Sequence, residues 1–176
     1  AKMMATIDRL SGGRFIAFLE AGLGRGEQVA YGTPWSDDHD ARVTRLEEGI
    51  GAIEALYAAT GPIDYHTPSV TLTQAELAPK PLQSKIPLWL GEAFPNVLDL
   101  TARVGDGWNT TPVTLAELDT RLAALDAALA RHGRDRRGVE ISFETQILVA
   151  PDRDGLRRKI AHMLEVSARS GGAPPQ

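Results

Sequence analysis

The sequence contains no cysteine among its 176 residues, which excludes disulfide bonds and thiolate metal sites. It has no apolar run long enough to cross a bilayer. It also lacks the basic runs and the mixture of basic and aromatic residues that bind nucleic acids, and its net charge is −4. No signal peptide is visible at its beginning. We therefore expect a cytoplasmic protein without nucleic-acid or membrane partners.

Histidine is also scarce, and the pattern gives no sign of a metal site. The four histidines lie apart, without the short spacings that metal ligands share; they are His39, His66, His132 and His162. His132 follows a predicted helix, where a cation is favourable. No metal site is predicted.

What the sequence does contain is an alternation of strand and helix patterns. Apolar residues make up 43% of it and charged residues 24%, which is enough for one sizeable core. After a helix that ends near Leu10, the patterns predict strands over 15–21, 86–91, around Trp108 and over 139–149, and helices over 40–59, 95–104, 115–132 and 154–168. A Gly-rich loop is expected at 22–26, and a short excursion or hairpin at 63–78.

Local signals support the helices. Ser36, Asp37 or Asp38 can cap the helix over 40–59, and Pro95 suits a first helical position. Thr114 and Glu117 have the spacing of a capping box.

Strands that alternate with helices are typical of an α/β protein with a parallel sheet and helices packed outside it. A (β/α)₈ TIM-type barrel needs eight strands and about 250 residues. Four predicted strands are too few to close one, so we expect a partial barrel or an open sheet.

We expect one domain over residues 1–169, with the excursion at about 61–85. A linker or truncated tail should follow at 170–176, where Gly and Pro accumulate. No capping residue precedes the first helical pattern, so either end is expected to be cut from a longer protein.

Five short segments make the sequence recognisable. It resembles the bacterial luciferase-like monooxygenase family, which includes deazaflavin-dependent reductases. The matching segments occur in the family's order and spacing; they are Ala5–Phe15, Arg45–Glu48, Leu77–Gln83, Pro87–Gly91 and Asp106–Asn109.

The resemblance implies a TIM barrel that binds FMN or the deazaflavin coenzyme F420 at the carboxyl ends of its strands. Residues 1–10 would then be the end of the third helix, and the strands would be the fourth to the seventh. The resemblance further implies an oxidoreductase or monooxygenase that acts on a small organic substrate by hydride transfer or oxygen activation at the flavin.

The family's cofactor site maps onto a small set of residues. A helix start offers free N–H groups to a phosphate, and one is predicted just after Gly91. The residues expected to bind the cofactor are Gly22, Gly91, Glu92, Ala93, Asn109 and Thr110. The structural alternative is that Gly91 is only a tight turn and that Asn109 and Thr110 only cap the next helix.

The sequence also departs from the family. Gly91-Glu92-Ala93 replaces a Gly-Gly-Ser-like turn, and the carboxylate of Glu92 would repel a phosphate unless it turns away. Phe18 and Glu20 replace two glycines of a Gly-x-Gly-x-Gly strand end, and Phe18 would collide with a flavin if it points into the lumen. Leu23 stands where the deazaflavin reductases have an acid.

Two alternatives follow from these departures. The first is a catalytically inactive half-barrel, or a homo-oligomer of it, acting as a binding module, because unpaired strand edges favour association. The second is a carboxylate-pair hydrolase. Along 139–149, Glu144 and Gln146 share the polar face, which would point inward. Glu20 and Glu144 are then candidate catalytic residues if their carboxyls lie about 5–9.5 Å apart.

Overall fold

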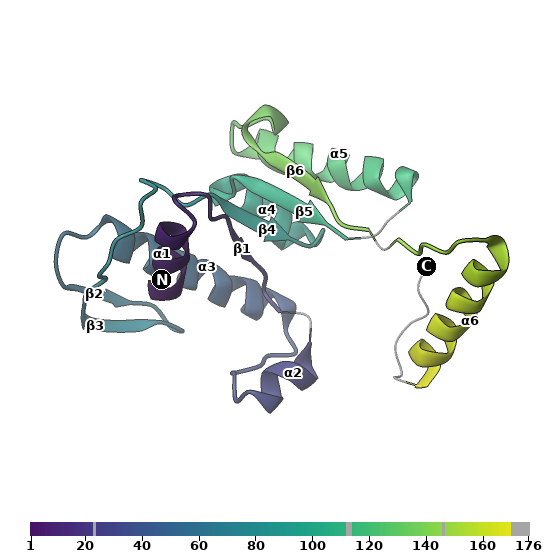
Figure 1. Cartoon of the computed structure of the whole chain (residues 1–176). Helices are drawn as coiled ribbons and strands as arrows, with labels where there is room; N and C mark the ends of the chain where they lie inside the picture. Colours follow the sequence, from purple (N-terminus) through teal and green to yellow (C-terminus); the bar gives the residue numbers. More distant parts are fainter. Residues whose placement is uncertain (23, 112–113, 146, 170–176) are drawn as a thin grey trace. The chain divides into compact units, whose positions relative to one another are not determined.

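The computed structural model describes residues 1–22, 24–111, 114–145 and 147–169 (Figure 1). Contacts divide the chain into two compact units, residues 1–144 and 145–176. No helix in the described part of the chain is long and apolar enough to span a membrane. The predicted tail at 170–176 lies outside the described residues.

The first unit is built on a four-stranded parallel sheet. The strands follow one another in the order β1, β4, β5, β6 (Figure 1), with the bounds β1 Ala17–Leu19, β4 Leu88–Gly91, β5 Gly107–Thr110 and β6 Glu140–Phe143. The predicted α/β class with a parallel sheet is confirmed.

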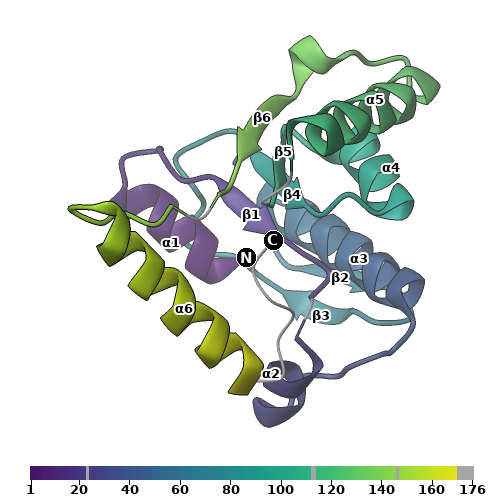
Figure 2. The ribbon, with the colours of Figure 1, turned by 90° about the vertical axis from the view of Figure 1, so that its right-hand side faces the viewer.

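Three helices cover one side of this sheet, as Figure 2 shows. They are α3 (His39–Ala58), α4 (Pro95–Val104) and α5 (Leu115–Arg131). Their starts follow the predicted signals: the carboxylate of Asp38 accepts a hydrogen bond from the Asp40 N–H, Pro95 is the first residue of α4, and Thr114 and Glu117 form the capping box.

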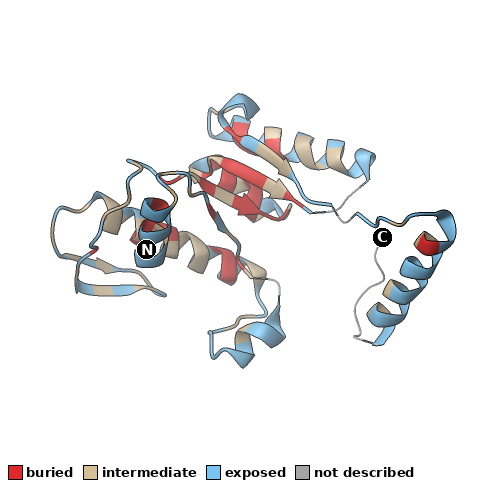
Figure 3. Ribbon diagram, in the orientation of Figure 1, coloured by how far each residue is buried: buried red, intermediate tan, exposed pale blue. Residues whose placement is uncertain are grey.

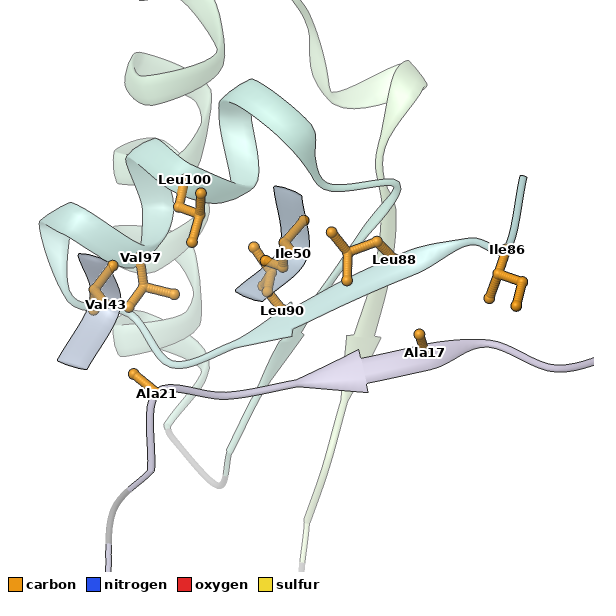
Figure 4. Packing of buried hydrophobic residues seen from close by; sticks show 9 residues of the cluster. All are labelled: Ala17, Ala21, Val43, Ile50, Ile86, Leu88, Leu90, Val97 and Leu100. Atoms are coloured by element: carbon orange, nitrogen blue, oxygen red, sulfur yellow. The ribbon is translucent and has the colours of Figure 1, made fainter. Parts of the chain in front are cut away.

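The core lies between the sheet and these helices. One buried cluster joins β1 and β4 to α3 and α4, and Figure 4 shows its nine residues, among them Leu88, Leu90 and Ile50. A second surrounds Trp108 and Leu125, between β5, α4 and α5. Burial is therefore concentrated in β4, β5 and α4 (Figure 3).

A hairpin and two more helices of this unit lie outside the sheet. The excursion forms an antiparallel hairpin of β2 (Ile63–His66) and β3 (Thr71–Ala75), as predicted. The first helix is α1 (Lys2–Leu10). The second, the short helix α2 (Arg25–Ala30), begins inside the stretch at 22–26 that was expected to be a Gly-rich loop. The expectation of a loop was therefore wrong at Arg25 and Gly26.

The second unit contains α6 (Arg153–Arg169). The strand predicted over 139–149 is wrong beyond Phe143, because no described residue after it belongs to a strand. Ile147 and Val149 are 77% and 71% exposed, so their alternation does not reflect packing on a sheet. Gln146, expected on the polar face of that strand, lies outside the described residues.

Candidate functional site

Parallel strands bring their carboxyl ends to one edge of the sheet, and we call this edge the mouth. Side chains that alternate along each strand divide between two sides. Leu88, Leu90 and Trp108 pack against the helices. The opposite side, which we call the open face, carries strand residues that include Phe18, Trp89, Gly91, Gly107, Asn109 and Ser142, and also Glu20, which directly follows β1.

Glycines on the open face are required by their neighbours. A Cβ atom on Gly91 would overlap Oε1 of Glu20 and would lie 2.9 Å from Cζ of Phe18. A Cβ atom on Gly107 would overlap the indole of Trp89. Phe18 and Glu20 therefore lie on the same face as Gly91, and the space above Gly91 is filled by protein.

The acids at the mouth influence the ionisation of Glu20. Partial burial raises the pKa of Glu20, and the charges of Glu92 and Glu144 raise it further. The charges of Glu144, the other candidate carboxylate, and of Glu92 are thus near enough to Glu20 to act on its ionisation. No group of three histidine or acidic residues in the described part of the chain is arranged to hold a metal ion.

Glu92 is held in an unusual conformation. Its backbone φ is +76°, a value that residues other than glycine seldom adopt. Its carbonyl accepts a 2.8 Å hydrogen bond from Nε1 of Trp108, and its Oε2 lies 3.0 Å from Nε2 of His39. The carboxylate is only 6% exposed, and its other oxygen, Oε1, is buried without a partner. The side chain therefore turns toward α3.

The hydrogen-bond network determines which nitrogen of His39 carries the proton. Nδ2 of Asn96 donates to Asp40 at 2.6 Å, and Oδ1 of Asn96 accepts from the N–H of Val97, which fixes the orientation of the amide. The same Nδ2 lies 3.1 Å from Nδ1 of His39. Nδ1 must therefore accept, so Nε2 carries the proton and donates a hydrogen bond to Oε2 of Glu92.

The start of α4 offers free donors. Among the described residues, the N–H groups of Ala93, Phe94 and Asn96 have no acceptor, and Pro95 has no N–H. The carbonyl of Phe94 already accepts from the N–H of Leu98. Unpaired N–H groups at a helix start favour an anion, as expected for this position.

The other residues predicted to bind the cofactor do not lie together on the open face. Nδ2 of Asn109 donates to Oγ of Ser142 on the open face. Thr110 is fully buried, and its hydroxyl accepts from Arg121 of α5, so it does not reach that face. Gly22, at φ +90°, lies beside Trp35 and Gln28. Leu23 lies outside the described residues.

Sequence reasoning missed His39, which it treated as one scattered histidine among four. Its role depends on Glu92, which is 53 residues away along the chain. The only local signal was its place directly after the capping residue Asp38.

Comparison with known proteins identifies the family. The family model described as luciferase-like monooxygenase matches residues 1–173. The chain therefore belongs to the luciferase-like monooxygenase family.

Its relatives in this family use two kinds of cofactor. The chain is 31% identical to an F420-dependent glucose-6-phosphate dehydrogenase of Microbacterium testaceum, over 88% of the chain and 45% of that protein. It is 27% identical to an FMNH₂-dependent dimethylsulfone monooxygenase of Pseudomonas putida, over 93% of the chain and 44% of that protein. The chain thus spans about half the length of these relatives.

Solved structures show the same fold. The coenzyme F420-dependent tetrahydromethanopterin reductase from Methanopyrus kandleri aligns with a TM-score of 0.71 and 19% identity, over 96% of this chain and 54% of that one. The fold is therefore a partial luciferase-like barrel, consistent with the predicted fourth to seventh strands.

Proposed function

We propose that this chain supplies the mouth of an oxidoreductase that uses FMN or coenzyme F420 and acts on a small organic substrate. The family and its relatives support the general activity. The observation that carries the proposal is the start of α4, where the N–H groups of Ala93, Phe94 and Asn96 have no acceptor among the described residues.

The residues at the mouth fit the anionic end of such a cofactor. The carboxylate of Glu92 would repel a phosphate, but it is turned to His39 and buried. The fit of the ring is different, because Phe18 and Glu20 fill the space directly above Gly91. A flavin ring must therefore lie elsewhere on the open face or displace these two side chains.

The roles of the chain's own residues follow from this geometry. The start of α4 binds the phosphate, and His39 keeps the carboxylate of Glu92 away from it. Asn109, anchored through its amide nitrogen to Ser142, presents its Oδ1 on the open face as an acceptor. When bound, the cofactor would supply hydride transfer or oxygen activation.

Fluorescence quenching tests the proposal. FMN and coenzyme F420 should each be titrated with the chain, with riboflavin as the matched probe that lacks the phosphate. We expect saturable quenching by the protein, and at least about tenfold tighter binding of FMN than of riboflavin, because a charged hydrogen-bonded group is worth about 1.5–3 kcal/mol. Absence of saturable quenching with both cofactors would contradict the proposal.

A substitution at Glu92 sharpens the test. Glu92→Gly removes one negative charge beside the phosphate site, and FMN should bind about 3–10-fold more tightly while riboflavin binding is unchanged. Glu117→Gln, which removes a charge at the start of α5, is the matched control and should change neither affinity. Equal gains for FMN and riboflavin would show that the phosphate does not lie at α4.

One observation favours a second function. Phe18 and Glu20 occupy the face where relatives leave room, which fits an inactive half-barrel that acts as an oligomeric binding module. That function predicts a stable oligomer by analytical ultracentrifugation together with no quenching of either cofactor. A monomer that binds flavin would contradict it.

A further inference from the structure

A separate cavity lies on the helix side of β1. It measures about 280 Å³ and is lined by residues from the end of β1 and from α3. Its walls are largely apolar, and they include Leu19, Ala21, Leu46, Ile50 and Ile53. Figure 4 shows two of these, Ala21 and Ile50, in the layer between strand and helix. The cavity is thus distinct from the open face of the sheet.

Arg42, which lines this cavity, is a buried cation. It is 8% exposed, and its guanidinium lies 4.4 Å from the ring centre of Trp35. Its Nη1 donates to the carbonyl of Ser36 at 2.8 Å. It forms no ion pair with any described residue, although an unpaired buried charge is strongly unfavourable.

One edge of this guanidinium is unused. Nε of Arg42 is buried without a hydrogen-bond partner, and Nη2 donates to no described residue. Nε–H and Nη2–H point the same way and form one of the two forks with which arginine binds a carboxylate through two parallel hydrogen bonds. These two donors have the geometry that binds a carboxylate, and because Nε is buried in the empty cavity, a carboxylate reaches it only when neighbouring side chains move aside.

No nearby acid neutralises Arg42. Glu20 lines the cavity, but its carboxylate lies against Gly91 on the open face. Asp37 accepts from Nε1 of Trp35 and lies 3.8 Å from Arg25. The second cation of the cavity, Arg45, donates to the carbonyl of Pro34 and has no acidic partner among the described residues either. The cavity therefore carries uncompensated positive charge.

We propose that this cavity binds a small monocarboxylate with a short aliphatic chain, whose carboxylate pairs with the Nε and Nη2 edge of Arg42. The planar fork matches a carboxylate, and the apolar walls match an alkyl chain. A cavity of about 280 Å³ limits the ligand to a small molecule. The site is independent of the cofactor site at α4, because it lies on the other side of β1.

Thermal unfolding of the full chain at pH 7 tests this site. Sodium acetate, butyrate and hexanoate should be titrated against sodium chloride at matched ionic strength. We expect the thermal midpoint to rise saturably with butyrate or hexanoate, by about 3–6 °C at ten times the half-saturating concentration. Acetate should bind more weakly because it lacks the chain that fills the apolar walls.

Two variants make the test specific. Arg42→Met keeps the bulk of the side chain but removes the fork, so its midpoint should respond equally to butyrate and chloride. Arg103→Met is the matched control, because Arg103 pairs with Glu47 and Asp99 outside this cavity and its loss should leave the butyrate effect intact.

Three outcomes would overturn the proposal: no saturable effect of any carboxylate, the same effect in Arg42→Met, or a larger effect of inorganic phosphate than of butyrate. Circular dichroism of Arg42→Met confirms that it is folded. If it is not, Arg42→Lys, which keeps the charge but loses the fork, should bind butyrate at least about tenfold more weakly, and undiminished binding would overturn the proposal.

Discussion

The acidic side chains at the two ends of the parallel sheet differ in how fully their carboxylates are hydrogen-bonded. At the amino end, the carboxylates of Asp8 and Asp106 are satisfied by hydrogen bonds. At the mouth, Glu92 has an unpartnered buried oxygen and a left-handed backbone, and Glu20 has no hydrogen-bond partner among the described residues. The amino end thus maintains the fold, whereas the mouth carries the unsatisfied groups near which the cofactor site is proposed.

Asp8 illustrates the stabilising end. Its carboxylate is fully buried and accepts from the N–H groups of Leu82 and Gln83 and from Nε2 of Gln83, at 2.7, 3.0 and 2.7 Å. Burial would raise its pKa, but these hydrogen bonds outweigh that effect and hold the pKa below its ordinary value. Asp8 thus ties α1 to the segment that enters β4.

Asp106 has the same role one strand further on. Its carboxylate accepts from the N–H of Leu88 at 3.0 Å and from Nζ of Lys85 at 2.5 Å. Its own N–H donates to the carbonyl of Leu88, and its carbonyl accepts from Glu140. One residue therefore sets the alignment of β4, β5 and β6 at their amino ends.

The largest effect should come from the amino end. Asp8→Ala leaves three donors without an acceptor, and we expect the thermal midpoint to fall by roughly 10 °C. Arg14→Ala, an exposed neighbour outside this network, is the control and should change the midpoint little. A loss of only one or two degrees for Asp8→Ala would remove the proposed difference between the two ends.

Asp8 also predicts a pH dependence. Its pKa in the folded protein lies below the unfolded value of about 3.9, so it stabilises the fold above that pH. This contribution is lost as the pH falls through the folded pKa. Urea unfolding between pH 2 and 6 should therefore show a flatter loss of stability in Asp8→Asn than in the parent, and parallel curves would contradict the assignment.

An intermediate effect is expected at the mouth. His39→Ala removes the partner of the buried carboxylate of Glu92, and the free energy of unfolding should fall by about 1–3 kcal/mol. In a Glu92→Gly background the same substitution should cost less than about 1 kcal/mol, because no buried charge remains to be satisfied. Equal costs in both backgrounds would show that His39 acts through other contacts.

The smallest effect concerns Glu20. Its raised pKa means that the protonated form favours the fold, a contribution that is complete below about pH 4.3 and is lost as the pH rises through the folded pKa. Carboxyl NMR titration should show that Glu92→Gln and Glu144→Gln each lower this pKa, while Glu117→Gln does not. An unchanged pKa in both variants would mean that burial alone causes the shift.

Much of the fold could be predicted because its signals are local. Both bounds of α4 follow from Pro95 and from Gly105 after Val104, and the capping box places α5. The parallel direction of neighbouring strands follows from the alternation of strands and helices along the chain. The end of β6 could not be predicted, because alternation continues to Val149 although no described strand pairs beyond Phe143.

The site was less accessible to sequence reasoning, because it depends on pairs that are distant along the chain. The sequence indicated that the carboxylate of Glu92 would have to turn away from a phosphate bound here, but nothing local to Glu92 indicated His39 as its partner. Likewise, Asp8 and Gln83 belong to separate matching segments that are 75 residues apart, and only the structure shows that one binds the other. Thr110 was predicted to bind the cofactor, and nothing in its local sequence indicated that it is buried on the helix side with its hydroxyl accepting from Arg121.

The strand order has one more consequence, for the rate at which backbone protons exchange with deuterated solvent. β4 and β5 have hydrogen-bonded neighbours on both flanks, whereas β1 and β6 each have one described neighbour. Amides in the middle of the sheet should thus retain their protons longest, while on the two outer strands roughly every second amide should be deuterated early. A companion polypeptide that adds a strand at either flank would reveal itself by slowing those early sites.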